Sequence, residues 1–315
     1  PLTPDQPNFA SYQRWLAAGE QADMHYMSRH ADKRADPRKF GFRSYISFAL
    51  CYGRKDRLCA KVPRVAQYAR IKDYHRLLRM KAARVALRLE LGAYRVLVDT
   101  APVLERALAM RGGRGFIGKN TCFISVKHGS YLLLGEIFFN REVPAVPVVG
   151  SSLVASGRSA AGGCGSCQRC QVFCPTGALD ADYRLDASKC LSYQTIENRG
   201  EIPAKYWVHL KNYYYGCDVC QIVCPYNRGK STSQSEDLRF PTLMQIALMS
   251  QGEYEQYFGG KALTRAKRGG LMRNALIALA AIKHPKLRAI VAELQIRDDL
   301  PDHAGLRGAI ASCRQ

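Results

Sequence analysis

The chain has 315 residues and a net charge of +21, from 47 lysines and arginines against 26 acidic residues. This length suits about two or three domains, and no apolar run reaches the roughly 18 residues of a membrane helix. A large positive charge favours an anionic partner, and without a basic amphipathic stretch we expect nucleic acid rather than a membrane. A basic surface with no such partner is the alternative.

Helical and strand patterns alternate over the first 140 residues. Apolar spacing predicts helices over 8–30 and 65–91, the second densely basic, and a strand over 44–50. A strand over 94–98 and a helix from Pro102 to about Arg111 follow, with the proline in the first turn. This alternation predicts an α/β domain.

A glycine-rich loop, Gly112–Asn120, comes next. It is not a P-loop, because no Ser or Thr follows Lys119 and the glycine spacing differs. Its glycines would allow the backbone to approach a bulky cofactor closely. Residues 121–125 and 131–139 then predict a β-hairpin around His128-Gly129.

Eight of the twelve cysteines lie between Cys164 and Cys224. The first run is cysteine-x-x-cysteine-x-x-cysteine-x-x-x-cysteine-proline, which is the spacing of bacterial ferredoxins that bind [4Fe–4S] clusters. The second run ends in the same way but lacks one cysteine, and Cys190 makes up the number. In such runs the cysteine before proline binds the other cluster. The crossover predicts one cluster on Cys164, Cys167, Cys170 and Cys224, and a second cluster on Cys174, Cys190, Cys217 and Cys220.

Disulfides and structural zinc are the alternatives for these cysteines. Disulfides suit secreted proteins, and nothing in the chain resembles an export signal. Zinc would use the Cys-x-x-Cys pairs but would not explain both Cys-Pro ends. We therefore expect two adjacent [4Fe–4S] clusters in a reducing, cytoplasmic setting.

The remaining segments predict a linker, a loop and a helical end. Residues 144–163 are rich in Pro, Gly, Ser, Val and Ala, and residues 228–238 are polar. Beyond residue 240, helical spacing recurs over 243–249, 271–282 and 287–294, which fits a short HEAT-like cap. The basic residues placed between or at the start of these helices are candidates for docking a phosphate backbone. They are Arg265, Lys267, Arg268 and Arg273.

Several stretches together resemble the epoxyqueuosine reductase family. They are Tyr68–His75, Val98–Arg106, Gly115–Asn120, Leu134–Glu136, Cys190–Tyr193, Glu197–Gly200, Tyr215–Cys220 and Arg273–Ala275. The resemblance implies an oxidoreductase that uses cobalamin and two clusters to reduce the epoxide of epoxyqueuosine in tRNA to queuosine. It also implies an external low-potential electron donor.

The same resemblance implies that Asp99 is the proton donor. Asp99 comes at the end of a predicted strand and just before a helix, where α/β domains often place functional residues. Removal of the epoxide oxygen requires protons, and an apolar cofactor face would raise the pKa of a carboxyl group enough to donate one. The alternative from the residues alone is a helix N-cap.

Cobalamin leaves no reliable mark in the sequence. The histidine-on motif Asp-x-His-x-x-Gly is nearly met at Asp73–Leu78, but its glycine is absent, so we expect His75 to be a surface or tRNA-facing residue and not a cobalt ligand. By analogy with the family, Asp99, Phe123, Ser192 and Asp218 lie near the corrin.

We therefore predict three units. Residues 1–150 would form an α/β (α+β) cobalamin-binding catalytic domain, residues 151–230 a ferredoxin-like two-cluster domain, and residues 231–315 a helical HEAT-like region that contacts tRNA. The protein would be a cytoplasmic monomer. A related cobalamin and iron–sulfur reductase of a small molecule, such as an organohalide, is the alternative function, and a ferredoxin-like carrier without a catalytic site is a third.

Overall fold

The computed structural model describes residues 1–4, 8–53, 64–71, 73–144, 163–211, 213–230 and 240–314. The predicted linker 144–163 and loop 228–238 fall largely outside these ranges. Among the described residues, no helix combines the length and the apolar character needed to span a membrane.

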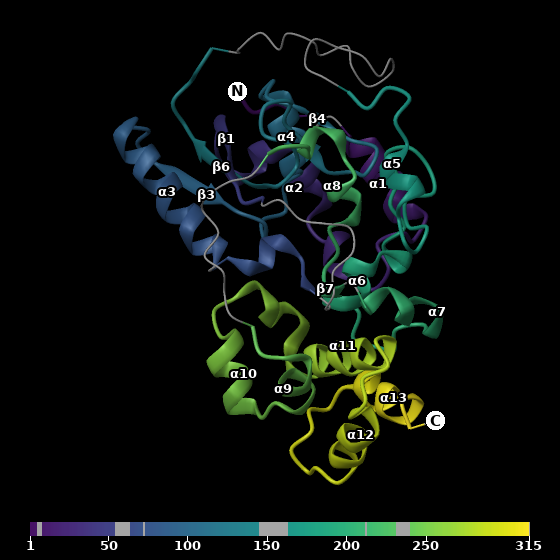
Figure 1. The fold of residues 1–315 in the computed structure, drawn as a ribbon. Helices are drawn as coiled ribbons and strands as arrows, with labels where there is room; N and C mark the ends of the chain where they lie inside the picture. Colours follow the sequence, from purple (N-terminus) through teal and green to yellow (C-terminus); the bar gives the residue numbers. More distant parts are fainter. Residues whose placement is uncertain are drawn as a thin grey trace.

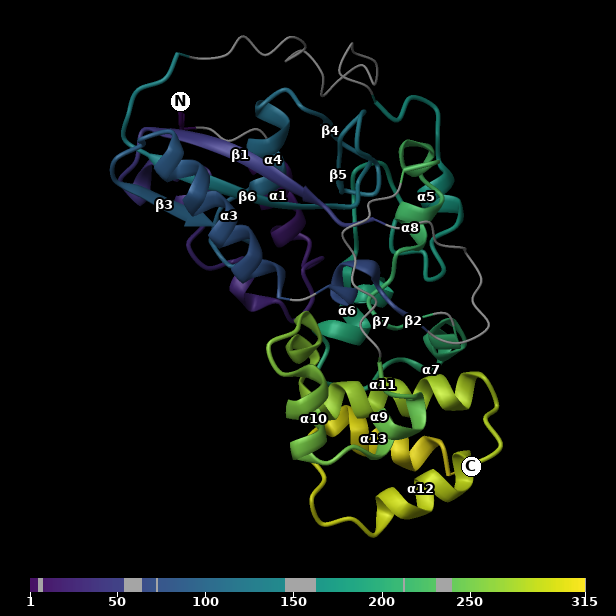
Figure 2. The ribbon, with the colours of Figure 1, turned by 60° about the vertical axis from the view of Figure 1, so that its left-hand side comes forward.

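An antiparallel three-stranded sheet forms the core of the N-terminal part (Figures 1 and 2). Its strands are β1 (Ser44–Cys51), β6 (Leu132–Phe139) and β3 (Tyr94–Leu97), in the order β1-β6-β3. Helix α3 (Tyr74–Arg88) covers one face and α4 (Glu105–Arg111) the other, each over its own apolar cluster. The predicted mixture of helices and strands is present, but with antiparallel strands the arrangement is α+β.

Several predicted elements are shorter than expected. The helix expected over 8–30 is α1 (Phe9–Ala17), followed by the one-turn η1 (His25–Met27), because Gly19 has a positive φ of 70°. Helix α3 starts at Tyr74, since Asp73 caps it by accepting from the His75 N–H. Helix α4 begins at Glu105, so Pro102 lies in the preceding loop.

The predicted hairpin of 121–125 with 131–139 is wrong. Strand β5 (Phe123–Ile124) pairs with β4 (Phe116–Ile117), whereas β6 pairs with β1 and β3. Only an isolated bridge joins Ser125 to Gly129. The glycine-rich loop explains the difference, because a side chain at Gly115 would come within 2.2 Å of the Ile124 carbonyl oxygen, so that glycine permits the β4–β5 contact.

The cysteine-rich segment contains two similar short helices that lie side by side, α5 (Arg169–Val172) and α8 (Val219–Ile222). Each begins within a Cys-x-x-Cys pair, contains the second cysteine of that pair and ends just before a Cys-Pro. Between them lie α6 (Leu191–Ile196), α7 (Ala204–Trp207) and β7 (Tyr213–Tyr215), and β7 pairs in parallel with β2 (Arg64–Val65). The two halves of the chain are thus joined by a strand pair.

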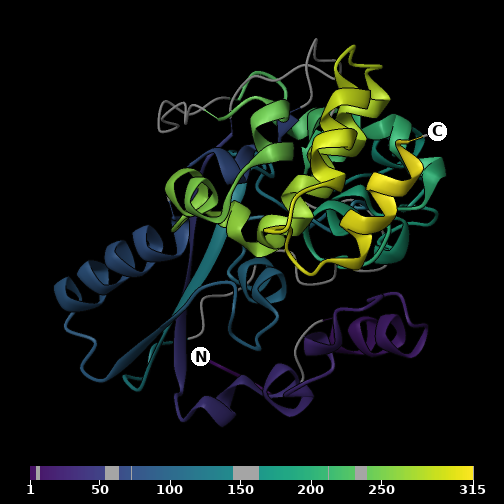
Figure 3. The ribbon, with the colours of Figure 1, turned by 90° about the horizontal axis from the view of Figure 1, so that it is seen from below.

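The C-terminal helices, coloured green to yellow, gather at one end of the molecule, which faces the viewer in Figure 3. Helix α11 (Lys267–Ala281) is buried along most of its length. An apolar helix of this kind occupies the centre of a bundle. Helix α11 packs against α9 (Leu243–Leu248), α12 (Leu287–Gln295) and α13 (Ala304–Ser312), whereas α10 (Gln251–Phe258) packs against η7 (Ala262–Ala266). One apolar core runs from these helices into β7, α6 and α7. The HEAT-like character and the three domain boundaries stay predictions.

Other short elements complete the described chain. They are α2 (Ala31–Ala35), η2 (Pro37–Phe40), η3 (Gln67–Arg70), η4 (Ala187–Lys189), η5 (Val208–Lys211), η6 (Pro225–Asn227) and η7 (Ala262–Ala266).

Candidate active site

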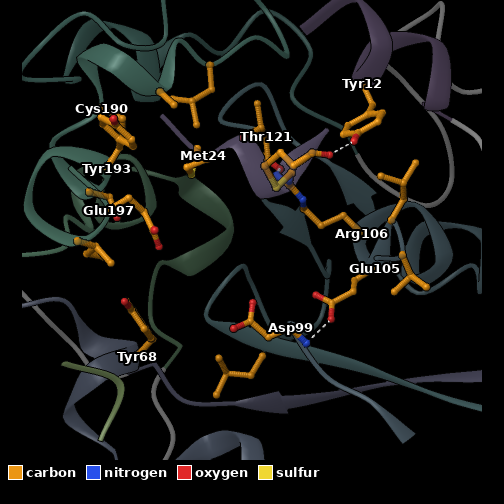
Figure 4. Close-up of a pocket in the computed structure, with 18 of the residues that line it drawn as sticks. Tyr12, Met24, Tyr68, Asp99, Glu105, Arg106, Thr121, Cys190, Tyr193 and Glu197 are labelled. Carbon is orange, nitrogen blue, oxygen red and sulfur yellow. Dashed lines mark hydrogen bonds between the residues drawn. The ribbon is translucent and has the colours of Figure 1, made fainter. Parts of the chain in front are cut away.

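A cavity of about 2320 Å³ lies between the N-terminal part, the cysteine-rich segment and the C-terminal helices. This is well above the roughly 300–1,000 Å³ of ordinary small-molecule sites. Its walls come from α1, the start of α3, the loop between β3 and α4, the glycine-rich loop, α6 and η7. Tyr12, Tyr68 and Tyr193 line it together with carboxylates and arginines (Figure 4). The cavity can therefore accept a large ligand with both apolar and polar parts.

Asp99 lies on the wall of this cavity in the loop after β3. Its side chain is 55% exposed, because it faces the open space of the cavity. Oδ2 accepts a hydrogen bond from the Tyr74 hydroxyl at 3.0 Å and lies 2.9 Å from Nε2 of His75. Leu104, not Asp99, holds the N-cap position of α4, so the N-cap alternative for Asp99 is wrong.

The pKa of Asp99 is lowered, chiefly by the hydrogen bond from His75. The same contact raises the pKa of His75. The expectation of a raised pKa at Asp99 is therefore corrected for the protein alone, because the imidazole stabilises the carboxylate. Both shifts favour the ion pair, in which the proton lies on His75 and Asp99 is a carboxylate. His75 is thus a cavity residue bound to Asp99, and its relation to tRNA and to cobalt stays a prediction.

Glu105, the first residue of α4, also lines the cavity. Its Oε1 accepts the Asp99 backbone N–H at 2.5 Å. Burial and the nearby negative charge of Asp99 raise the pKa of Glu105 to about 7. Behind it lies Glu136 of β6, which is fully buried and whose pKa is raised well above the ordinary value by burial and by Glu105.

The eight thiols of the cysteine-rich segment fall into two groups by their mutual electrostatic contacts. Cys224 interacts with Cys164 and Cys170, and Cys170 also interacts with Cys167. Cys217 interacts with Cys190 and Cys174, and Cys220 interacts with Cys217 and Cys190. The two groups have the same members as the sets expected from the crossover, and the binding of a cluster by each set stays a prediction. Among the described residues, no group of three or more His, Cys, Asp or Glu side chains is arranged to hold a single metal ion.

The two thiol groups differ in their relation to the cavity. Cys190 of the second group lines the cavity, whereas no cysteine of the first group does so among the described residues. The first group is tied to the glycine-rich loop, since the Lys119 N–H donates to Cys164 Sγ at 3.4 Å. Lys119 Nζ is in turn paired with Asp182 at 3.0 Å.

The residues expected near a corrin are divided. Ser192 and Asp99 line the cavity. Phe123 and Asp218 are buried outside its lining: Phe123 packs behind Gly115, and the Asp218 carboxylate accepts the Gln67 N–H at 2.7 Å. Phe123 and Asp218 therefore do not line the described cavity, because the side chain of each is in contact with the backbone of a neighbouring segment.

The four basic docking candidates are also divided. Arg265 and Lys267 are exposed and line the cavity, although Arg265 is paired with Glu197 at 2.8 Å. Arg268 is buried and donates to the Met249 carbonyl oxygen. Arg273 has 0% exposure and donates to three backbone carbonyls. The expectation that Arg268 and Arg273 contact phosphates is corrected, since their guanidinium groups serve the protein interior.

Sequence reasoning missed three residues. Glu105 falls within a recognised stretch, but its spacing of six from Asp99 gives no hint that it contacts the Asp99 backbone. Tyr74 reads as an apolar helix position, and its hydroxyl reaches Asp99. Cys122 lacks cluster spacing, and its thiol contacts that of Cys220. Each of these contacts is made by the tertiary fold, so the sequence around the residue does not predict it.

Two segments match known protein families. Residues 34–100 match "Epoxyqueuosine reductase QueG, DUF1730", and residues 163–227 match "4Fe-4S double cluster binding domain". The epoxyqueuosine reductase of Xanthomonas campestris is 36% identical over 307 residues, which cover 91% of this chain and 83% of that protein. The chain belongs to the epoxyqueuosine reductase family. Another epoxyqueuosine reductase, from Pseudomonas aeruginosa, is 36% identical over 93% of this chain and 82% of its own length.

Solved epoxyqueuosine reductases share the fold. The Streptococcus thermophilus structure superposes with a TM-score of 0.82 at 28% identity, over 98% of this chain and 83% of that one. A complex with an epoxyqueuosine-modified tRNA-Tyr stem loop gives 0.78 at 27% identity, over 99% and 84%. A Bacillus subtilis structure, described with its aspartate-bearing catalytic loop swung out of the active site, gives 0.76 at 27% identity, over the same shares.

Proposed function

We propose that the chain reduces the epoxide of epoxyqueuosine in tRNA to queuosine. Family membership supports this reaction, and one observation carries it to the site. The thiol of Cys190 and the carboxylate of Asp99 line the same large cavity. An electron-delivering group and a proton-handling group thus face one space, as the reduction of an epoxide requires.

The overall reaction takes two electrons and two protons. The carbon–oxygen bonds of the epoxide break, an alkene forms, and the oxygen leaves as water. The two thiol groups would each hold a [4Fe–4S] cluster, and the group with Cys190 would be the one nearer the substrate. An external low-potential donor would supply the electrons to the more distant cluster.

Cobalamin fits the cavity by size and by chemistry. The volume exceeds that of ordinary ligand sites, and the aromatic walls suit a macrocycle with apolar faces. Ser192, Tyr68 and the glycine-rich loop from Gly113 to Ile117 would surround it. When bound, its cobalt would pass the electron pair to the substrate carbon.

We expect side chains of this chain to donate a proton in the reaction. Asp99 faces the cavity and shares a proton with His75, so the pair can donate one of the two protons to the departing oxygen, and the second would come from solvent. The Tyr74 hydroxyl orients the carboxylate from the other side. The walls contributed by α1, α6 and η7 would limit water around the reacting centre once substrate fills the space.

The tRNA would meet the basic rim of the cavity. Lys267 and Arg265 lie at η7 and the start of α11, and the exposed ammonium of Lys267 is suited to a phosphate. The modified base would leave its stack and enter the cavity. We expect the enzyme to act as a monomer in the cytoplasm.

One assay tests this function against a small-molecule reductase of the organohalide type. The reconstituted protein is incubated with cobalamin, a low-potential reductant and tRNA bearing epoxyqueuosine, and the nucleosides are then analysed. Queuosine should form, and omission of cobalamin should abolish it. Absence of queuosine at correct iron and cobalt contents, with turnover of a halogenated small molecule, would establish the alternative.

A further inference from the structure

Asp99 lies at the centre of a tight three-residue turn. Its φ is +58°, and the Thr100 N–H donates to the Val98 carbonyl oxygen at 2.6 Å across it. Three-residue turns with a positive φ at the centre are rare and strained. Such a conformation persists only where surrounding groups hold it in place. The position of the Asp99 carboxylate therefore depends on what holds this turn.

Glu105 contacts the backbone of the turn directly. Its Oε1 accepts the Asp99 N–H at 2.5 Å, and Figure 4 shows its carboxylate reaching from α4 toward Asp99. Tyr74 and His75, which both belong to α3, contact the side chain of Asp99 and not its backbone in the described hydrogen bonds. The turn is thus held on its backbone side by α4 and on its side-chain side by α3.

Glu105 is itself firmly placed. Helix α4 packs on the sheet through Leu108, which is buried in the same apolar cluster as Leu97 and Phe138. Glu136 lies on this face of the sheet, opposite Ser47 on β1 and Leu97 on β3. Neither oxygen of Glu136 has a hydrogen-bond partner in the described residues, and its contact with Ser47 falls outside ordinary hydrogen-bond geometry.

We propose that Glu105 is a positioning residue whose carboxylate latches the turn that presents Asp99 to the cavity, and that protonation of Glu105 loosens this latch. The positioning role rests on the proposed function, because it concerns the same proton donor. A carboxylate is a stronger acceptor for an N–H than a neutral carboxyl group. Ionised Glu105 therefore holds the turn more tightly than protonated Glu105.

The charged and titratable neighbours of Glu105 set the pH of this change. They are Asp99 in the turn, His75 and Tyr74 on α3, Glu136 on β6 and Arg106 on α4 itself. Burial and the charge of Asp99 raise the pKa of Glu105 to about 7, against weaker opposition from the hydrogen bond of the Asp99 N–H and from Arg106 and His75. The latch should therefore tighten as the pH rises through neutrality.

Hydrogen exchange at the Asp99 amide tests the latch without any turnover. The wild type, Glu105→Gln, Glu105→Ala and the surface control Glu142→Gln are compared at pH 6 and pH 8, after correction for the intrinsic exchange rate. Wild type and control should show greater protection at pH 8. Glu105→Gln should show the same protection at both values, and Glu105→Ala should lose about tenfold or more at pH 8. Equal protection in wild type and Glu105→Ala, or a retained pH dependence in Glu105→Gln, would overturn the latch.

Turnover tests the positioning role. In Glu105→Ala, kcat should fall on the order of 10²-fold while KM for tRNA stays unchanged, since only the acid is displaced. Glu105→Gln, which is nearly isosteric, should lose about fivefold in kcat and lose the fall in activity at acid pH. Circular dichroism and iron content verify folding. An unchanged kcat in Glu105→Ala would reject the positioning role, whereas wild type without queuosine formation would reject the proposed function and leave the exchange result intact.

Discussion

The Nε2 atom of His75 lies 2.9 Å from Oδ2 of Asp99, and the imidazole is stacked on Tyr74 at 4.0 Å between ring centroids. The contact raises the pKa of His75 and lowers that of Asp99. The two side chains therefore share a proton, which is retained to higher pH than Asp99 alone would allow. We propose that this proton goes to the departing oxygen.

Replacement of His75 should move the alkaline limb of activity. In the wild type the pair loses its last proton above the ordinary pKa of histidine, because Asp99 stabilises the imidazolium. In His75→Asn the pKa of Asp99 returns toward its ordinary value, so the acid is ionised well below neutrality. The profile of kcat against pH should lose activity at lower pH than in wild type. An alkaline limb in the same place would show that His75 holds no catalytic proton.

Asp99→Asn should retain cofactors and lose turnover. The amide keeps the size of the carboxyl group and can still accept from Tyr74, but it has no proton to donate to the departing oxygen. A loss in kcat on the order of 10²–10⁴-fold is expected for removal of a general acid. Absorption spectra give the iron–sulfur and corrin content, and nucleoside analysis gives the rate. Wild-type turnover in this variant would eliminate Asp99 as the donor.

Cys190→Ser should remove one cluster. The thiol belongs to the group with Cys174, Cys217 and Cys220, and a serine hydroxyl is a poor ligand for iron. Roughly half of the iron should be lost on purification, together with electron transfer to the cavity. Cys51→Ser is the matched control, because Cys51 lies on β1 and belongs to neither group. Full iron content in Cys190→Ser would contradict the predicted ligand set.

Lys267→Ala should weaken tRNA binding similarly for different tRNAs. Its ammonium is exposed on the cavity rim, and a phosphate contact there would release about one counterion. The slope of log K against log salt should therefore fall by about 1. Lys286→Ala serves as the control, since Lys286 is exposed and does not line the cavity. A slope identical to wild type would remove Lys267 from the interface.

Arg273→Met should affect stability and not the salt dependence of RNA binding. The guanidinium is fully buried and donates to the carbonyl oxygens of Gln194, Asn198 and Gly200. Its loss leaves buried acceptors without partners, which costs on the order of 3 kcal/mol. A thermal melt should show a clear drop relative to the exposed control Arg288→Met. A changed salt slope with unchanged stability would restore the RNA-contact prediction.

Part of the fold could be predicted from local pattern and part could not. The spacing of apolar residues predicts the strand at Ser44 and the helices of the C-terminal part, because this spacing depends only on residues that are neighbours in the chain. The β4–β5 pair was missed because His128-Gly129 is typical of a hairpin turn and therefore predicted residues 131–139 as the partner of 121–125. Which strands pair was decided by the long-range contact of β6 with both β1 and β3.

The candidate site shows the same division. Arg265, Lys267, Arg268 and Arg273 are alike in the sequence, since each is a basic residue near the start of a helix. Burial separates them, because α11 is enclosed by α9, α13 and the cysteine-rich segment, and two of the four side chains therefore point into protein.

The sequence by itself determined the chemistry that this chain carries: the spacing of the thiols, the positive charge and the aspartate after a strand. The spacing of the cysteines involves residues that are close together in the chain, so the sequence alone reveals it. Only the tertiary structure decided that Cys190 and Asp99 share a cavity, that His75 lowers the pKa of Asp99, and that Glu105 accepts the Asp99 N–H. These relationships are between segments that are far apart in the chain, and the order of the residues does not show which segments meet in the folded protein.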